Sequence, residues 1–351
     1  MFSVLKRNST ALVGIDFGSH SIKAIALSKS NRVFQIDAVA EAVLPKGVIV
    51  DNNFEDIAKL TQVIKQLRKK IPASYRHAAI AVSGADVITK VITMNADYNE
   101  FELESQVEIE AENSIPFPLD EIFLDFEIIS PHMADRSLND ILLSAARKET
   151  VLSQVHCVES AGLIIKVVDV GSHAQSRACE LIFEREDDDK GIAIVDIGAS
   201  QMMLNIVHGG HIIFSCSKNH GGAVCTQMMA DHYKMKFKDA EKAKITHTWP
   251  PGCERDVLTP FIYMTVNYLR FDLRMFTNVP KNIQVEKIIL IGGCHLIPGL
   301  VEQIELQLGL NVMVANPFVD FEYRNKSDKT LLHNAGAKYM TALGLALRGA
   351  E

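Results

Sequence analysis

Hydrophobic and polar positions alternate in blocks at the start of the chain, and the blocks predict a small sheet. Apolar stretches occupy 11–18, 22–27 and 32–43, and short polar segments such as 28–31 separate them. Apolar stretches of this length between polar turns are typical of consecutive antiparallel strands. We therefore expect the chain to open with three strands that lie side by side.

A helix pattern follows this sheet. From Phe54 to Leu67 the apolar residues recur at three- and four-residue steps, so that they share one face of a helix. The polar residues 51–53 are suited to open this helix, and Pro72 ends it. The uninterrupted apolar run 78–82 then predicts a buried strand.

The opening pattern returns in the middle of the chain. An apolar strand there ends in Asp196 and Gly198, just as the first strand ends in Asp16 and Gly18, 180 residues earlier. A hairpin pattern follows each of them, the second with a Gly-Gly turn inside 202–215. Two copies of one pattern indicate a duplicated domain, and we expect two similar lobes that face each other across a cleft.

A strongly acidic segment interrupts the first copy. Between Lys90 and Arg136 there are twelve Asp and Glu residues and no Lys or Arg, which is a local charge of −12 in a chain whose net charge is −7. The rest of the chain therefore carries +5, and we expect an inserted subdomain at this place. The order of the first lobe then resumes with a strand at 141–146, a helix near 148–161 and a strand at 164–170.

Composition excludes several classes of protein. The chain has 351 residues, of which 48% are hydrophobic and 23% charged, so two lobes with cores of their own are expected and disorder is excluded. No apolar run approaches the roughly 20 residues of a membrane-spanning helix, and the first residues do not form a secretory signal. The six cysteines lack metal-ligand spacing and indicate reduced thiols. The negative net charge argues against general nucleic-acid binding, which needs a cationic surface.

The two Asp-x-Gly strand ends carry side chains suited to a nucleotide. Gly18 permits a tight turn whose N–H groups can point at an anion, and the hydroxyls of Ser19 and Ser21 add further donors. Lys23 can supply a positive charge for a phosphate, and Asp16 can hold Mg²⁺ through its waters. The matching residues of the second lobe are Asp196, Gly198 and Ser200.

Two glycine pairs add to this prediction. Gly221 and Gly222 follow a strand pattern and open a helix pattern that contains Thr226. Gly292 and Gly293 stand between an apolar strand and another helix near the end of the chain. Glycine at such a junction lets a phosphate or a flat ring approach the backbone and the helix N-terminus.

In this order, the four motifs resemble those of the actin/Hsp70/sugar-kinase ATPase superfamily. The resemblance implies an α/β fold of the duplicated, actin-like (ribonuclease H-like) type, with two lobes and an α+β subdomain inserted in the first. It implies ATP and Mg²⁺ between the lobes, with the phosphates on the first two motifs and the ion held through water by Asp16 and Asp196. The nucleoside would then lie against both glycine pairs and Thr226, with Glu241 and Lys244 beside adenine and ribose.

Within the superfamily the chain resembles the cell-division protein FtsA and the PilM family of type IV pilus assembly. Both have an extra subdomain where the acidic segment lies, and Ile115, Pro116, Phe117 and Pro118 resemble PilM in particular. An FtsA protein would continue into an amphipathic membrane-targeting helix, and we expect none here. The expected domains are 8–88 (first lobe), 89–165 (insertion), 166–190 (first lobe continued and hinge), 191–330 (second lobe, with a smaller part at 235–285) and 331–351 (a closing helix that returns to the first lobe).

The PilM resemblance implies a cytoplasmic, actin-like, ATP-binding scaffold that is peripheral at the inner membrane and not inserted in it. Its partner would be the short N-terminal cytoplasmic tail of the inner-membrane protein PilN, bound in a groove between the first lobe and the insertion. The acidic helix can place Phe101, Leu103, Val107 and Ala111 on an apolar stripe, and its crowded carboxylates favour a basic partner.

Other functions stay open at this point. No residue declares itself as the base of ATP hydrolysis, so hydrolysis is expected to be slow or negligible. An FtsA-like or other filament-forming actin homologue and a small-molecule kinase are the alternatives. Self-association and contacts with other pilus assembly proteins are left undecided by the sequence.

Overall fold

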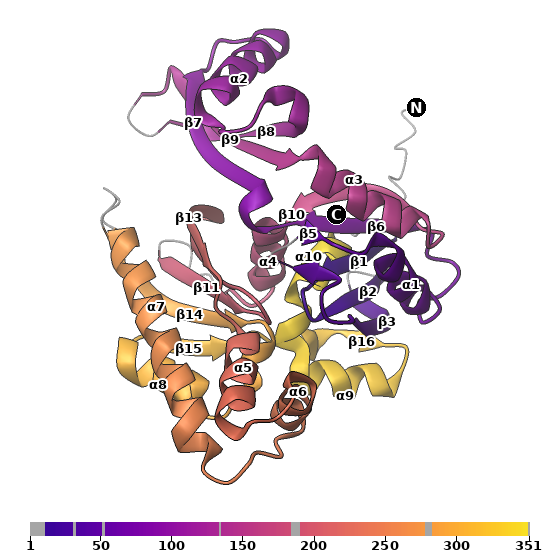
Figure 1. Ribbon diagram of the computed structural model, residues 1–351. Coiled ribbons are helices and arrows are strands. Elements are labelled where there is room, and N and C mark those ends of the chain that lie inside the picture. The colour runs from indigo at the N-terminus through magenta and orange to yellow at the C-terminus, as the bar shows by residue number, and fades with distance from the viewer. Residues whose placement is uncertain are drawn as a thin grey trace.

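The computed structural model describes residues 11–30, 33–50, 53–132, 135–183, 190–277 and 283–349. Two lobes lie against each other, and a smaller unit extends from the first of them (Figure 1). Each lobe is built on a mixed β-sheet with helices on its faces. This arrangement confirms the predicted α/β, two-lobed architecture.

The first lobe is built on a six-stranded sheet of β1 (Leu12–Phe17), β2 (Ser21–Ser30), β3 (Val33–Val43), β6 (His77–Val82), β10 (Ile164–Val170) and β16 (Glu322–Tyr323). The spatial order is β10-β6-β1-β2-β3-β16. β1, β2 and β3 are antiparallel neighbours, as the three apolar runs predicted. β6 runs parallel to β1, and β10 runs parallel to β6.

Two helices, α1 (Ile57–Arg68) and α3 (Lys148–Glu159), bury their apolar sides with residues of this sheet in one core. α1 begins later than the predicted polar start at 51–53. Its N-cap is Asp56, whose carboxylate accepts a hydrogen bond from the Lys59 N–H at 2.9 Å. Asn53 instead belongs to a short strand, β5 (Asn53–Phe54), which pairs with β4 (Ile49–Val50), and residues 51 and 52 lie outside the described part.

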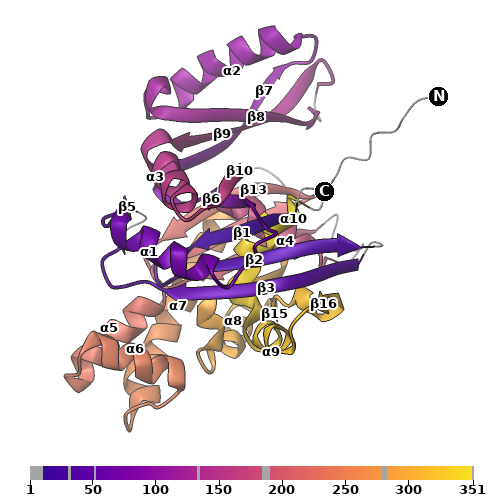
Figure 2. The same ribbon diagram turned by 90° about the vertical axis from the view of Figure 1, so that its right-hand side faces the viewer.

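The insertion is a three-stranded sheet covered by one helix. It contains β7 (Val87–Asn95), α2 (Glu100–Ser114), β8 (Ile122–Pro131) and β9 (Leu138–Arg147), and its strand order is β7-β9-β8. α2 lies along the outer side of the sheet (Figure 2). The expectation that a strand at 141–146 resumes the first lobe was wrong, because that segment is β9 and pairs only with β7 and β8. The range 89–165 thus also takes in α3, which packs with the first lobe.

The second lobe repeats the plan of the first. Its sheet contains β11 (Gly191–Ile197), β12 (Met202–His208), β13 (His211–Lys218), β14 (Val285–Ile291) and β15 (Asn311–Val314). The order β13-β12-β11-β14-β15 matches β3-β2-β1-β6-β10, with the same two antiparallel and two parallel pairings. Its helices are α5 (Gly222–Tyr233), α6 (Phe237–Thr246), α7 (Thr259–Thr277) and α8 (Leu300–Leu308).

Two helices lie between the sheets and join the lobes: α4 (Gly171–Glu180) and α10 (Met340–Leu347). Ile25 of the first sheet, Ile289 of the second and Leu343 of α10 share one core. α10 packs so closely on α4 that a side chain at Gly344 would collide with the Ala174 carbonyl. The closing segment does return to the first lobe, but as α9 (Lys326–Ala335), a 3₁₀ turn (Gly336–Tyr339) and α10, not as one helix.

Candidate functional site

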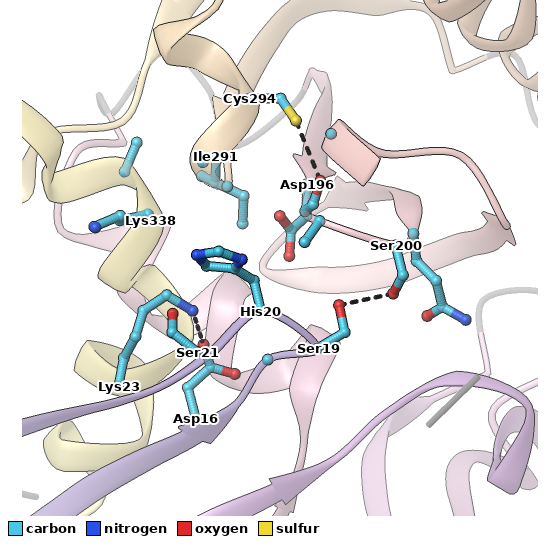
Figure 3. Close-up of a pocket in the computed structure, with 18 of the residues that line it drawn as sticks. Asp16, Ser19, His20, Ser21, Lys23, Asp196, Ser200, Ile291, Cys294 and Lys338 are labelled. Carbon is cyan, nitrogen blue, oxygen red and sulfur yellow. Dashed lines mark hydrogen bonds and ion pairs between the residues drawn. The ribbon is translucent and has the colours of Figure 1, made fainter. Parts of the chain in front are cut away.

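A pocket of about 400 Å³ lies between the two lobes. It takes residues from the ends of β1 and β11, from α6, and from the turns that follow β14 and α9. Thirteen of the fifteen predicted site residues line it: Asp16, Gly18, Ser19, Ser21, Lys23, Asp196, Gly198, Ser200, Gly222, Glu241, Lys244, Gly292 and Gly293. Gly221 and Thr226 do not. Figure 3 shows Asp16 and Lys23 on one side of the pocket, and Asp196 and Ser200 on the other.

On the first-lobe side, Asp16 and Lys23 form a register pair of β1 and β2. The Lys23 Nζ atom donates to Asp16 Oδ2 at 3.0 Å, and both side chains are largely shielded from solvent. Burial disfavours the charged ammonium, but the carboxylates of Asp16, Glu41 and Asp196 together outweigh burial and raise the pKa of Lys23 above its ordinary value. Lys23 therefore places a fixed positive charge at the first-lobe wall of the pocket.

On the second-lobe side, Asp196 stands at the end of β11. Its Oδ2 accepts a hydrogen bond of 2.7 Å from the amide nitrogen of Gln175. Burial, and then the charge of Asp16, raise the pKa of Asp196 to about 6. A bound cation would stabilise the ionised form of a buried carboxylate whose pKa is raised in this way. This property is expected of a carboxylate in a divalent-ion site.

Gly292 is required beside this carboxylate. Its φ is +86°, a conformation that favours glycine, and a Cβ there would collide with Asp196 Oδ1 and the Ile197 carbonyl oxygen. Gly293 has a different surrounding, because a Cβ at that position would meet nothing within 4 Å. Only the first glycine of this pair is thus fixed by close packing against the site.

The loops of the two lobes touch at the pocket. Ser200 Oγ donates to Ser19 Oγ at 2.9 Å, which joins the two Asp-x-Gly turns directly. Within the second lobe, the Gly222 N–H donates to the Gly198 carbonyl at 3.0 Å. Gly221 has no contact with the pocket, but a Cβ there would lie 2.7 Å from the Gly198 and Ala199 carbonyl oxygens. The absence of a side chain at Gly221 lets the start of α5 approach the turn that contains Gly198 and Ala199.

A hydrogen-bonded cluster supports the pocket wall on α6. Lys244 Nζ donates to Glu241 Oε2 at 2.8 Å, to the Gly222 carbonyl at 2.7 Å and to Thr226 Oγ1 at 2.7 Å. The hydroxyl of Thr226 in turn hydrogen-bonds to Glu241. Thr226 is fully buried beneath the wall, so it holds the two charged residues in place and does not face the cavity.

Sequence reasoning missed several polar residues that line the pocket, among them His20, Glu41, Gln175 and Lys338. Glu41 accepts hydrogen bonds from Ser21 and Lys338, both at 2.7 Å, and from Tyr339 at 3.1 Å. Burial opposes its charge, but Lys338, Ser21 and Lys23 together outweigh burial and hold the pKa of Glu41 below its ordinary value. His20 lies in the turn between β1 and β2. Its ring is 3.8 Å from Glu241, and burial lowers its pKa.

On the insertion, the predicted apolar stripe of α2 is correct for three residues and wrong for one. Leu103, Val107 and Ala111 are buried against the sheet, whereas Phe101 is 77% exposed. On the strands, Val91 and Phe123 are also exposed, at 46% and 44%. Their neighbours in sequence pack under α2, so these two side chains point to the opposite face of the sheet.

A comparison with protein families matches residues 14–350 to the family "Type IV pilus assembly protein PilM". The chain belongs to the PilM family. A solved structure described as the PilM–PilN type IV pilus biogenesis complex has a TM-score of 0.84 and 27% identity, covering 97% of this chain and 99% of that one. The cell-division protein FtsA of Bacillus subtilis is 21% identical over 96% of this chain and 83% of its own length.

More distant structures share only the fold. The ethanolamine utilization protein EutJ of Carboxydothermus hydrogenoformans has a TM-score of 0.57 at 16% identity, covering 96% of this chain and 90% of its own. FtsA of Enterococcus hirae is 22% identical over 87% of this chain and 78% of its own. The protein is therefore an actin-like member of the pilus assembly family, and this family match gives no support to the small-molecule kinase alternative. Among the described residues, no helix has both the length and the apolar character needed to cross a bilayer.

Proposed function

We propose that this PilM-family protein binds Mg²⁺-ATP between its lobes. The observation that carries the proposal is the placement of one carboxylate from each lobe, Asp16 and Asp196, at equivalent strand ends around one pocket. Lys23 and the hydroxyls of Ser19 and Ser200 fit a phosphate chain, and the two carboxylates fit a divalent ion that keeps its waters. Bound Mg²⁺ would supply charge neutralisation for the phosphates.

The remaining wall fits a nucleoside. Gly292 and Gly293 expose backbone that a flat ring can approach, and Glu241 and Lys244 present polar groups suited to ribose hydroxyls. Hydrolysis is proposed to be slow or negligible. Glu41 is a poor base because three donors already engage its carboxylate.

The proposed partner is PilN, bound through its short N-terminal cytoplasmic segment. Support comes from the similar structure, which is named as a complex of PilM with PilN, and from the face of the insertion's sheet that lies opposite α2. On that face Val91 and Phe123 offer apolar contact. Binding there would hold the protein at the inner membrane by its partner.

Nucleotide and partner sites are proposed to be coupled. The insertion is attached to the first lobe, so a change in the angle between the lobes would change the position of the second lobe relative to the insertion. A synthetic peptide of the PilN N-terminal segment, labelled and followed by fluorescence anisotropy, tests this with and without Mg²⁺-ATP. We expect its affinity to change severalfold with nucleotide in the wild type and not in Asp16→Ala. An affinity that is the same with and without nucleotide in both proteins contradicts the coupling.

A further inference from the structure

The insertion has a hydrophobic core of its own. In the part of the chain that the structure describes, its buried apolar residues form one cluster under α2, and those of the first lobe form a separate cluster. Figures 1 and 2 show the insertion extending from the first lobe, to which the chain connects it before β7 and after β9. The angle of the insertion on the first lobe therefore depends on these two connections and on the polar contacts beside them.

Arg147 lies at the second connection, as the last residue of β9 and the N-cap of α3. Its guanidinium carbon is 4.2 Å from the centre of the Phe117 ring, which is a cation–π contact. Its Nε is 3.7 Å from Asp86 Oδ1 at the first connection, and Asp86 Oδ2 accepts a hydrogen bond of 3.0 Å from Thr150 Oγ1 of α3. Arg147 therefore links a ring of the insertion, through Asp86, to a helix of the first lobe.

Lys148, the first residue of α3, reaches the same part of the insertion. Its Nζ donates to the Asp120 carbonyl oxygen at 2.7 Å. Asp120 and Phe117 both lie in the segment between α2 and β8, which contains the Ile-Pro-Phe-Pro sequence at 115–118. The two prolines fix their own φ angles, and Phe117 packs against the core of the insertion. The segment is thus a stiff part of the insertion, so cations that hold it also hold the insertion as a whole.

Lys148 also borders the face that is proposed for the partner. Its Nζ is 5.6 Å from the centre of the Phe123 ring, on the side of the sheet opposite α2. At this point the sheet face is therefore next to α3 of the first lobe. A different angle of the insertion would change the distance between Phe123 and α3.

We propose that Arg147 and Lys148 form a latch that sets the angle of the insertion on the first lobe and so positions the sheet face for the partner. Both are positioning residues, which act through the orientation of the insertion. The effect on partner binding rests on the proposed function, whereas the effect on the angle does not.

Pulsed electron paramagnetic resonance measures the angle as a distance between two spin labels. The labels are attached at Asn113→Cys in α2 and Lys65→Cys in α1, which are exposed positions. Cys216→Ser confines labelling to these two sites, because the other five cysteines are buried. Binding of the PilN peptide to the same proteins, without labels, is followed by fluorescence anisotropy.

The latch is removed in the double variant Arg147→Leu with Lys148→Met. Phe117→Leu, which removes the ring and keeps an apolar side chain, is the second variant in case the double variant does not unfold cooperatively. Arg136→Leu is the matched control. Arg136 is an exposed arginine of the insertion, but it lies in the hairpin between β8 and β9, at the opposite end of these strands from Arg147.

We expect one narrow distance distribution in the wild type and in the control, and a wider or shifted distribution in the latch variants. The peptide should bind the latch variants about three- to tenfold more weakly, since only part of the molecules then has the competent orientation. An unchanged distribution in the folded latch variants overturns the latch. A changed distribution with unchanged affinity overturns its role in partner binding. A wild type that does not bind the peptide overturns the proposed partner, while the distances still decide whether the latch exists.

Discussion

Lys23 and Met203 occupy equivalent positions in the duplicated sheets. Lys23 is the register partner of Asp16 across β1 and β2, and Met203 is the register partner of Asp196 across β11 and β12. Both register pairs therefore contain a carboxylate, but only the pair of the first lobe also contains a cation. Asp16 has its charge balanced by Lys23, whereas Asp196 has an amide neighbour and a raised pKa.

This asymmetry predicts that Asp196 lowers the free energy of unfolding when no ligand is bound, by an amount that depends on pH. The pKa of about 6 in the folded protein lies above the ordinary value of 3.8, so ionisation destabilises the fold as the pH rises through this range. Asp196→Asn should raise the free energy of unfolding at pH 8 by on the order of 2 kcal/mol, and by about half as much at pH 5. Denaturant unfolding at the two pH values, without nucleotide or Mg²⁺, measures this. A gain that is independent of pH would contradict it.

Lys23 should contribute directly to phosphate binding. Lys23→Met removes the ammonium that is bonded to Asp16, and we expect Mg²⁺-ATP affinity to fall about 10- to 100-fold, in line with the loss of a charge-assisted hydrogen bond. Calorimetric titration gives the affinity. Lys59→Met is the control, because Lys59 is on α1 and 61% exposed. Equal affinities of the two variants would show that Lys23 serves only as the counter-ion of Asp16.

The glycine pair after β14 offers a matched comparison. Gly292→Ala would combine a positive φ with a collision at Asp196, and we expect a loss of about 2–4 kcal/mol in stability together with loss of nucleotide binding. Gly293→Ala should be tolerated, because its added Cβ meets nothing within 4 Å. Thermal unfolding measures the stability of both variants. Similar melting temperatures for the two variants would be inconsistent with the described geometry.

The two faces of the insertion should differ in partner binding. Phe123→Ala removes an exposed ring from the sheet face opposite α2, and we expect about 5- to 30-fold weaker binding of the PilN peptide. Phe101→Ala removes an even more exposed ring from α2 and should leave binding unchanged. Anisotropy titrations of both variants decide this. A loss confined to Phe101→Ala would place the peptide on the helix instead.

Much of the fold and part of the site could be predicted because the signals are local. Asp16 with Gly18 and Asp196 with Gly198 are close in sequence, and a strand that ends in a tight turn is recognisable from a few residues. Glu41 and Lys338 could not be predicted in the same way, since their contact joins positions 297 residues apart. Gln175 does not belong to a recognisable sequence motif, and its contact with Asp196 depends on the packing of α4.

The errors in the insertion have a similar cause. The apolar run at 141–146 indicates a strand but not the sheet to which the strand belongs, and β9 therefore lies in a different sheet from the one expected. Phe101 is two residues before Leu103, a step that turns by roughly 200° around an α-helix, so its ring lies on the side of α2 that faces solvent.

The most direct test of the central claim is calorimetric titration of ATP into the wild type, Asp16→Ala and Asp196→Ala, each with Mg²⁺ and with EDTA. The account predicts one site per chain in the wild type, tighter with Mg²⁺ than with EDTA, and loss of the Mg²⁺-dependent gain in each of the two variants. A wild-type protein whose ATP affinity is unaffected by Mg²⁺, or variants that keep the full gain, would contradict the claim that these two carboxylates form one ion site.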